Sequence, residues 1–357
     1  MRAGSKILVF PAYRANPYLN LLMLDASAQG REVVRAHTVD DLVREALRLS
    51  RGDVLHVHWT TPIVQQAPGD RIAARRLRTL SALLRAQRAR GVSVLWTIHN
   101  RLPHETARHD LEVRLHRLLA EAADAIHIMS PATPELLADI VRLPPEKVRE
   151  IPHPSYEGIY DTGIDRAEAR ASFDLADERA ALFLGQIRPY KGVDSLIAGA
   201  AEASGRPGAP EIALLLAGQV KEMPLDEFRS SLPAGLRTEA HLAFVDDGDI
   251  ARWFLAADVA VFPYRAILNS GSVHLAATFR VPVVLPDEPH LRAQFAGETW
   301  VAFFDPARPE ESIADLLADP DLFAGVDDAS FEAFLSRITP WRVAERYADL
   351  VAELSVV

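Results

Sequence analysis

Short apolar segments alternate with longer amphipathic segments along almost the entire chain. The short segments have the size and composition of buried strands, and the longer ones repeat apolar residues at helical spacing. Strand-then-helix alternation predicts parallel sheets covered by helices on both faces, because parallel strands need helix-length crossovers. We expect strands at residues 6–10, 32–36, 54–58, 92–98, 125–128, 148–151, 181–185, 212–217, 241–245, 258–263, 281–285 and 300–304, and helices at 18–29, 71–90, 108–122, 192–204 and 271–279.

The alternation is interrupted once, at residues 151–165. This segment, "IPHPSYEGIYDTGID", has two prolines, two glycines and no periodicity. A length of 357 residues fits two domains. We therefore predict an α/β protein with two doubly wound, Rossmann-like domains, at residues 1–160 and 161–337. Residues 338–357 begin a new amphipathic pattern at Pro340, which periodicity alone predicts to be one more packing helix.

Composition limits the class of protein. The chain has no cysteine, which excludes disulfides, thiolate metal sites and a cysteine nucleophile and fits a reducing cytoplasm. Since no window approaches the roughly 18 apolar residues of a membrane-spanning helix, we expect a cytoplasmic protein. The net charge of −10 argues against a nucleic-acid binder. Residues 1–160, however, hold 22 basic and 17 acidic residues, and residues 161–357 hold 17 and 32.

Much of the basic excess lies in the predicted helix 71–90, which has seven arginines and no acidic residue. Its apolar side chains (Ala73, Leu77, Leu80 and Leu84) fall on one face. A basic amphipathic helix predicts peripheral contact with an anionic membrane, at the inner face of the plasma membrane. The alternative is an ordinary solvated face, in a sequence that contains only four lysines.

Two strand ends in the second half have features that bind anions. "GQIRPYKG", residues 185–192, places Arg188 and Lys191 directly before a helix. "PYRAILNSGSVHLAA" supplies helix-start residues Asn269, Ser270 and Gly271. Cations and the free N–H groups of a helix start bind phosphate, so the two segments together predict a diphosphate site. An ordinary loop and helix cap remains the alternative for each.

Histidines follow or precede several strand ends in the first half. His58 and His99 end predicted strands and His153 lies in the interdomain segment, so we expect the three to face one cleft. His56 and His127 lie inside strands and are expected to be buried packing residues. We expect His56 and His58 to point to opposite faces. No carboxylate stands at ligand spacing from these histidines, so no metal site is expected.

Several common motifs are absent. No G-x-G-x-x-G follows the first strand, and neither G-x-x-x-x-G-K-[ST] nor G-x-S-x-G occurs. The usual dinucleotide fingerprint, the P-loop and the hydrolase nucleophile elbow are therefore excluded.

The motifs that are present resemble, in order, those of GT-B glycosyltransferases of family 4, the "group 1" class. The resemblance covers nearly the whole chain and rests on "DVLHVHW", "VLWTIHN", "ADAIHIMSPAT", "VREIPHPSY", "LFLGQIRPYKGVDSLIAG", "AADVAVFPY", "SGSVHLAATFRVPVV" and the tail from Pro340. It implies an N-terminal acceptor domain and a C-terminal donor domain that face a cleft. It also implies that the last helix crosses back to the N-terminal domain.

The resemblance implies transfer of a sugar from a UDP- or GDP-sugar to an acceptor hydroxyl of a polysaccharide, glycolipid or lipid-linked saccharide, with no metal or further cofactor. Its catalytic residues would be His99, Arg188 and Lys191. The donor would contact Gly185, Gln186, Arg188, Lys191, Gly218, Tyr264, Asn269, Ser270, Gly271 and Ser272. Candidates on the acceptor side are Asn16, Tyr18, His58, His104, Glu105 and His153.

The chain departs from the family pattern in two places. The Glu-x7-Glu pair of family 4 falls on Ile267 and Leu275, so the glutamate that normally holds the ribose hydroxyls is missing. The glycine-rich first loop is replaced by "PAYRANPYLNLL". Retention is expected from the resemblance, but inversion stays open, with Glu105 or His104 as general base. Three other hypotheses compete with this one: a nucleotide-sugar epimerase, a phosphorylase with a pyridoxal-bearing lysine, and a non-catalytic nucleotide-sugar-binding partner.

Overall fold

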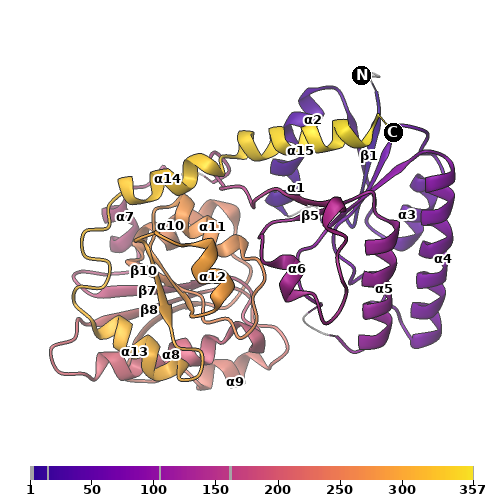
Figure 1. Cartoon of the computed structure of the whole chain (residues 1–357). Helices are drawn as coiled ribbons and strands as arrows, with labels where there is room; N and C mark the ends of the chain where they lie inside the picture. The colour runs from indigo at the N-terminus through magenta and orange to yellow at the C-terminus, as the bar shows by residue number, and fades with distance from the viewer. Residues whose placement is uncertain (1–3, 14–15, 104–105, 161–162, 357) are drawn as a thin grey trace. The chain divides into compact units, whose positions relative to one another are not determined.

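The computed structural model describes residues 4–13, 16–103, 106–160 and 163–356 and consists of two α/β units (Figure 1). The first unit combines residues 1–154 with residues 338–357, and the second spans residues 155–337. The chain therefore leaves the first unit after Pro154 and returns to it at Ile338. Among the described residues, no helix is long and apolar enough to span a membrane.

The first unit is built on a six-stranded parallel sheet in the order β2-β1-β3-β4-β5-β6. Most of its strands are buried on both faces, which is why they are continuous apolar runs. The strands are β1 (Lys6–Phe10), β2 (Glu32–Arg35), β3 (Val54–Val57), β4 (Ser93–Thr97), β5 (Ala125–Ile128) and β6 (Val148–Glu150). The helices are α1 (Pro17–Leu22), α2 (Leu24–Ala28), α3 (Val39–Ala46), α4 (Asp70–Ala89), α5 (His109–Ala122), α6 (Thr133–Leu136) and α15 (Pro340–Leu354).

The C-terminal helix α15 packs on α1 and α2 and on one face of this sheet (Figure 1). Its apolar stripe, which includes Val343, Tyr347 and Val351, is buried in one cluster with β1 and the first helices. Polar contacts add to the packing, since Ser93 Oγ donates to Leu354 O at 2.6 Å. The predicted crossing of the last helix back to the N-terminal region is confirmed.

The second unit contains another six-stranded parallel sheet, in the order β12-β11-β10-β7-β8-β9. The predicted α/β class with two parallel sheets is thus confirmed. Its strands are β7 (Arg179–Leu184), β8 (Ile212–Ala217), β9 (Arg237–His241), β10 (Val259–Val261), β11 (Val283–Pro286) and β12 (Val301–Phe304). Its helices are α7 (Arg166–Ala171), α8 (Val193–Ser204), α9 (Leu225–Ser230), α10 (Asp247–Ala256), α11 (Gly271–Thr278), α12 (Pro289–Gln294), α13 (Pro309–Ala318) and α14 (Ala329–Arg337).

Two predicted elements are wrong. The strand expected at 241–245 lies four residues earlier, as β9, because β9 is an edge strand paired only with β8 and has a polar sequence. The apolar residues behind it form a loop in which Phe244 is 67% exposed. The helix expected at 18–29 is two short helices, because the chain leaves regular helical geometry at Met23.

Each sheet reverses its strand order at one point. In the first unit the reversal lies between β1 and β3, and in the second it lies between β7 and β10. The connections of the two strands leave toward opposite sides there, which opens a crevice outside their carboxyl ends. These two crevices are where ligands of such sheets bind.

Candidate active site

The loop between β7 and α8 occupies the crevice of the second unit. It forms a 3-10 turn at Pro189–Lys191, and Gly192 then adopts φ 65° and begins α8. A Cβ on Gly192 would lie 2.0 Å from the Pro263 carbonyl oxygen. Only glycine therefore lets this loop approach the chain that follows β10, and the approach brings the two predicted anion-binding segments together.

Lys191 lies against aromatic rings in this crevice. Its Nζ is 4.0 Å from the ring centroid of Tyr264 and 5.5 Å from that of Tyr190. Burial lowers the pKa of Lys191, but the two phenol oxygens raise it, and the pKa ends above its ordinary value. Among the described residues no carboxylate forms an ion pair with Lys191. The ammonium group is therefore charged and available to an anion.

Arg188 is held differently. Its Nη1 lies 2.6 Å from Glu222 Oε1, and its Nε donates to Gln186 Oε1 at 3.1 Å. Glu222 adopts φ 67°, a left-handed conformation that is unfavourable for a side chain with a Cβ. A diphosphate in the crevice would compete with the Glu222 carboxylate for the same guanidinium.

The start of α11 faces the same loop. Ser270 is its N-cap residue and makes no side-chain capping bond, so the first-turn N–H groups have no capping oxygen from it. Ser272 Oγ lies 4.0 Å from the position of a Cβ on Gly185. Behind them, a Cβ on Gly218 would lie 1.9 Å from Gly185 O, so the segments after β7 and β8 are also in close contact. The predicted donor residues thus come from the carboxyl ends of β7, β8 and β10, Asn269 and Gly271 included.

Ile267 and Leu275, where the resemblance places the family's glutamate pair, supply no carboxylate here. Leu275 is buried in α11, and the Ile267 carbonyl oxygen lies 3.1 Å from His290 Nε2. Among the described residues, no group of three or more His, Asp or Glu side chains is arranged to hold a metal ion.

The crevice of the first unit has a different lining. We call Tyr18, His58, Trp59, His99 and His153 the histidine–aromatic cluster. Trp59 and His99 stack with ring centroids 4.1 Å apart, and His58 Nδ1 lies 3.0 Å from His99 Nε2. The Tyr18 ring lies 5.3 Å from His99 and 4.9 Å from His153. The structure thus brings the three predicted histidines together around Tyr18.

Two aromatic residues at this edge were not predicted. Trp59 is part of the cluster, and Tyr13, which is 42% exposed, lies 5.1 Å from the Trp59 ring. Their positions just after β1 and β3 are the signal that could have identified them. Asn16 has a local task, since its Oδ1 accepts the Tyr18 N–H and caps α1. His104 and Glu105 lie outside the described residues.

The prediction that His56 and His58 point to opposite faces is wrong. Residues two apart in a strand share a face, and the two rings are 3.8 Å apart. Burial, followed by the charge of neighbouring histidines, holds the pKa values of His58 and His99 well below the ordinary value, so both imidazoles are neutral. A cavity of about 20 Å³, large enough for one water molecule, lies beside them. His58 Nε2 is buried without a hydrogen-bond partner in the described part of the chain.

Behind the cluster, a buried hydrogen-bond chain links the sheet to α15. The Ile151 carbonyl oxygen can only accept, so His127 donates from Nε2, and its Nδ1 accepts from the Thr97 hydroxyl at 2.9 Å. Thr97 then accepts from His56 Nε2 at 2.7 Å, which leaves His56 Nδ1 to accept from the Tyr347 hydroxyl at 2.9 Å. Burial lowers the pKa of His127 to about 4. The chain requires neutral imidazoles at both positions.

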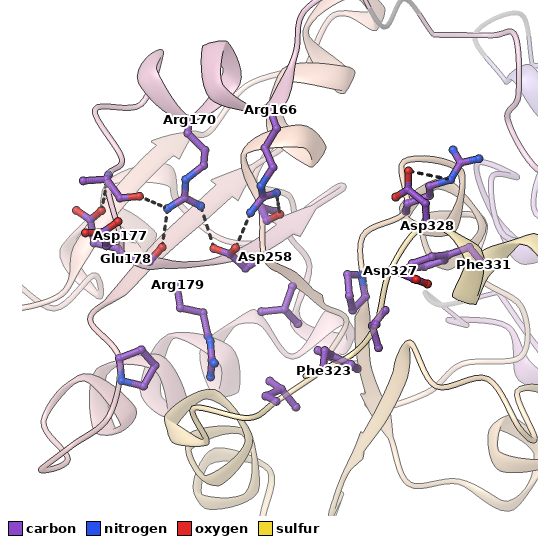
Figure 2. Close-up of a pocket in the computed structure, with 18 residues that line it drawn as sticks. Arg166, Arg170, Asp177, Glu178, Arg179, Asp258, Phe323, Asp327, Asp328 and Phe331 are labelled. Carbon is purple, nitrogen blue, oxygen red and sulfur yellow. Dashed lines mark hydrogen bonds and ion pairs between the residues drawn. The ribbon is translucent and has the colours of Figure 1, made fainter.

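The opposite, amino edge of the second sheet holds a cavity of about 580 Å³ that is rich in arginine (Figure 2). These arginines are already engaged: Arg166 and Arg170 both bind Asp258 and main-chain carbonyls. Arg179 binds the carbonyls of Leu317, Asp319 and Pro320. These arginines therefore hold loops together. The carboxyl edge of the sheet is the better candidate for the donor site.

Comparison with known proteins agrees with this geometry. A family model for "Glycosyl transferases group 1" matches residues 178–319, which include both anion-binding segments. The matched residues identify the chain as a glycosyltransferase with a group 1 domain. Its fold is GT-B, as in HepE of Anabaena, solved with UDP (TM-score 0.70, 14% identity, 98% of this chain and 100% of that one). Sucrose-phosphate synthase of Thermosynechococcus elongatus is similar as well (TM-score 0.73, 16% identity, 99% and 100% covered).

The transferase also resembles a GDP-mannose:glycolipid 4-beta-D-mannosyltransferase of Xanthomonas campestris pv. campestris. The two are 26% identical over 268 residues, which are 74% of this chain and 70% of the relative. The transferase is thus a hexosyltransferase that uses a nucleotide sugar.

Proposed function

We propose that the transferase moves a hexose from a nucleotide diphosphate sugar to a glycolipid or lipid-linked saccharide, with GDP-mannose as the first donor to test. The observation that carries this proposal is the pair of cations, Arg188 and Lys191, beside the α11 start at the strand-order reversal. The name of the Xanthomonas relative supports GDP-mannose and a glycolipid acceptor. UDP-sugars are the second choice, supported by the UDP in the HepE structure.

The chemistry needs charge stabilisation on the leaving group. The acceptor oxygen bonds to the anomeric carbon, the bond from that carbon to the diphosphate oxygen breaks, and the diphosphate leaves with the electron pair. Lys191, Arg188 and the first N–H groups of α11 would stabilise the charge that develops on it. The neutral His99 would bind the transferred sugar or position the nucleophile, and Asn16, Tyr18, His58 and His153 remain the acceptor-side candidates.

The stereochemical outcome separates two versions of this proposal. The family resemblance predicts retention. A β-mannoside made from GDP-mannose, in which mannose is α-linked, has inverted configuration, so the Xanthomonas relative favours inversion. The anomeric configuration of the product, measured by NMR, distinguishes the two.

The exposed face of α4 supports a membrane-bound acceptor. Arg71, Arg75, Arg78 and Arg85 follow helical spacing on this face and are exposed, and within the described residues none of them forms an ion pair. Ile72 beside them is 38% exposed. Such a face attracts anionic lipid, with about 1 kcal/mol per arginine near the surface. Sedimentation with phosphatidylglycerol vesicles tests this, and no binding at low salt would contradict membrane contact.

The donor half of the proposal is tested by thermal shift with UDP, GDP, ADP and TDP. A ligand at 100 times its Kd stabilises the folded protein by about 2.7 kcal/mol, so the correct base should raise Tm clearly above the others. Incubation with the matching sugar nucleotide should then release nucleoside diphosphate and yield glycosylated lipid extract. No stabilisation by any of the four would overturn the nucleotide-sugar assignment of this crevice.

A further inference from the structure

Arg265, the residue after Tyr264, connects the two loops of the donor crevice. Its backbone N–H donates to Tyr190 O at 2.9 Å. Its side chain divides between two partners, since Nη1 donates to Pro189 O at 2.6 Å and Nη2 binds the Asp194 carboxylate. Pro189 belongs to the turn that carries Lys191, and Asp194 lies in the first turn of α8.

The guanidinium therefore spans the junction between the turn and the helix. Pro189 O also accepts the Gly192 N–H at 3.2 Å, so the carbonyl that closes the turn is the one that Arg265 holds. Arg188 is the N-cap residue of that turn and Lys191 is its last residue. A fixed angle between the turn and α8 fixes where both cations are presented.

We propose that Arg265 is a positioning residue for the donor diphosphate, whose guanidinium bridges Pro189 O and Asp194 and so presets the turn that carries Arg188 and Lys191. This inference rests on the proposed function of the same crevice and adds to it a residue that does not need to touch the ligand. It also gives a role to the arginine of "PYR", the segment that follows β10.

The chemistry of the side chain suits this task. The planar guanidinium donates in two fixed directions, whereas a lysine ammonium is a point charge on a flexible chain and does not reproduce the fork. The ion pair with Asp194 is half or more exposed on both sides (51% and 64%), so it adds little to global stability. Its loss should therefore change donor binding more than folding.

The test compares Arg265→Lys and Arg265→Gln with the wild type, using GDP against GMP and UDP against UMP in thermal-shift and calorimetric titrations. Arg206→Gln is the matched control, because the Arg206 guanidinium also bridges two acceptors in the same unit, here the carboxylates of Glu202 and Asp315. We expect both Arg265 variants to bind the diphosphate about tenfold more weakly, about 1.4 kcal/mol, with the monophosphate and the ligand-free Tm nearly unchanged. The donor KM should rise in parallel.

Arg265→Lys decides between positioning and simple attraction, because it keeps the charge and removes the fork. Diphosphate binding at wild-type strength in Arg265→Lys would overturn the inference. A wild-type protein that binds neither diphosphate would instead overturn the proposed function, so the two failures are distinguishable.

Discussion

The two sheets both reverse their strand order near the middle, yet the crevices at their carboxyl edges have opposite chemistry. The first is lined by neutral imidazoles and aromatic rings around Tyr18 and His99. The second presents a charged ammonium and guanidinium beside a helix start. Topology therefore fixes where a ligand binds, and the residues that end the strands decide which ligand it is. The first edge suits a neutral saccharide and the second a diphosphate.

The largest expected effect is on the cationic edge. Lys191→Ala and Arg188→Ala should each lower kcat/KM by about 10²- to 10³-fold, because each removes a preorganised charge from the leaving group. Arg170→Ala, at the amino edge of the same sheet, is the matched control: it should lower the free energy of unfolding and leave kcat unchanged. Urea melts and single-turnover transfer assays measure the two effects. Wild-type turnover in both Lys191→Ala and Arg188→Ala would show that the cations at the carboxyl edge contribute no more to catalysis than Arg170 at the amino edge.

The close approach of the two donor loops gives the next effect. Gly192→Ala should cost more than about 2 kcal/mol of stability, because it adds a left-handed alanine and a Cβ 2.0 Å from Pro263 O. It should also abolish stabilisation by GDP. Gly208→Ala is the control, with a positive φ of 79° and open space around its Cβ, and should cost only about 1 to 2 kcal/mol. Equal losses of stability in the two variants would mean that the close approach of the two donor loops does not require glycine at position 192.

Acid should affect the first unit more than the second, because burial lowers the pKa values of five histidines in the first (His56, His58, His99, His116 and His127) and of two in the second (His274 and His290). Burial lowers the pKa of His127 to about 4 from 6.5, so between these values the unfolded chain binds a proton that the folded chain does not. Stability is then complete above about pH 6.5 and falls as the pH drops toward 4, by up to about 3 kcal/mol for this residue. Hydrogen exchange at pH 7 and pH 5 measures this. His127→Gln should reduce the pH dependence of the first unit, and His109→Gln, at an exposed position, should not. Equal pH dependence in the two variants would contradict the assignment to His127.

The smallest effect tests what restrains Arg188. Glu222→Gln removes the carboxylate that competes with a diphosphate, so GDP should bind about threefold more tightly at low salt, the size expected for a partly exposed ion pair. Glu202→Gln, which loosens Arg206 away from the crevice, should change nothing. Calorimetric titration of each variant with GDP measures this difference in affinity. Weaker GDP binding in Glu222→Gln would show that Glu222 holds Arg188 in its productive place.

The donor loop could be predicted from the sequence because its chemistry is local. Residues 185–192 contain the glycines, both cations and the helix start in one segment, and the structure keeps them together. The role of Arg265 was not predictable in this way, because its partners Pro189 and Asp194 are more than 70 residues away in the chain. Edge strand β9 was misplaced since its polar residues give no burial signal.

The histidines show the same limit. Their positions at strand ends could be predicted from the sequence. The hydrogen bond between His56 and Tyr347 could not, because the two residues are 291 positions apart in the chain. Thr97, which joins His56 to His127, has no sequence feature that marks it as a link. Contacts of this kind come from the packing of α15 and require the structure.

The placement of α15 has a consequence for biosynthesis. The second unit is continuous in sequence and emerges from the ribosome complete, while the first unit still lacks the helix that covers Tyr18, Leu22 and Ala26. That apolar face stays uncovered until α15 has emerged from the ribosome, which is the stage at which a chaperone would bind or aggregation would begin. A premature stop before Pro340 would therefore leave a chain whose second unit is folded and whose first unit is the target of quality control.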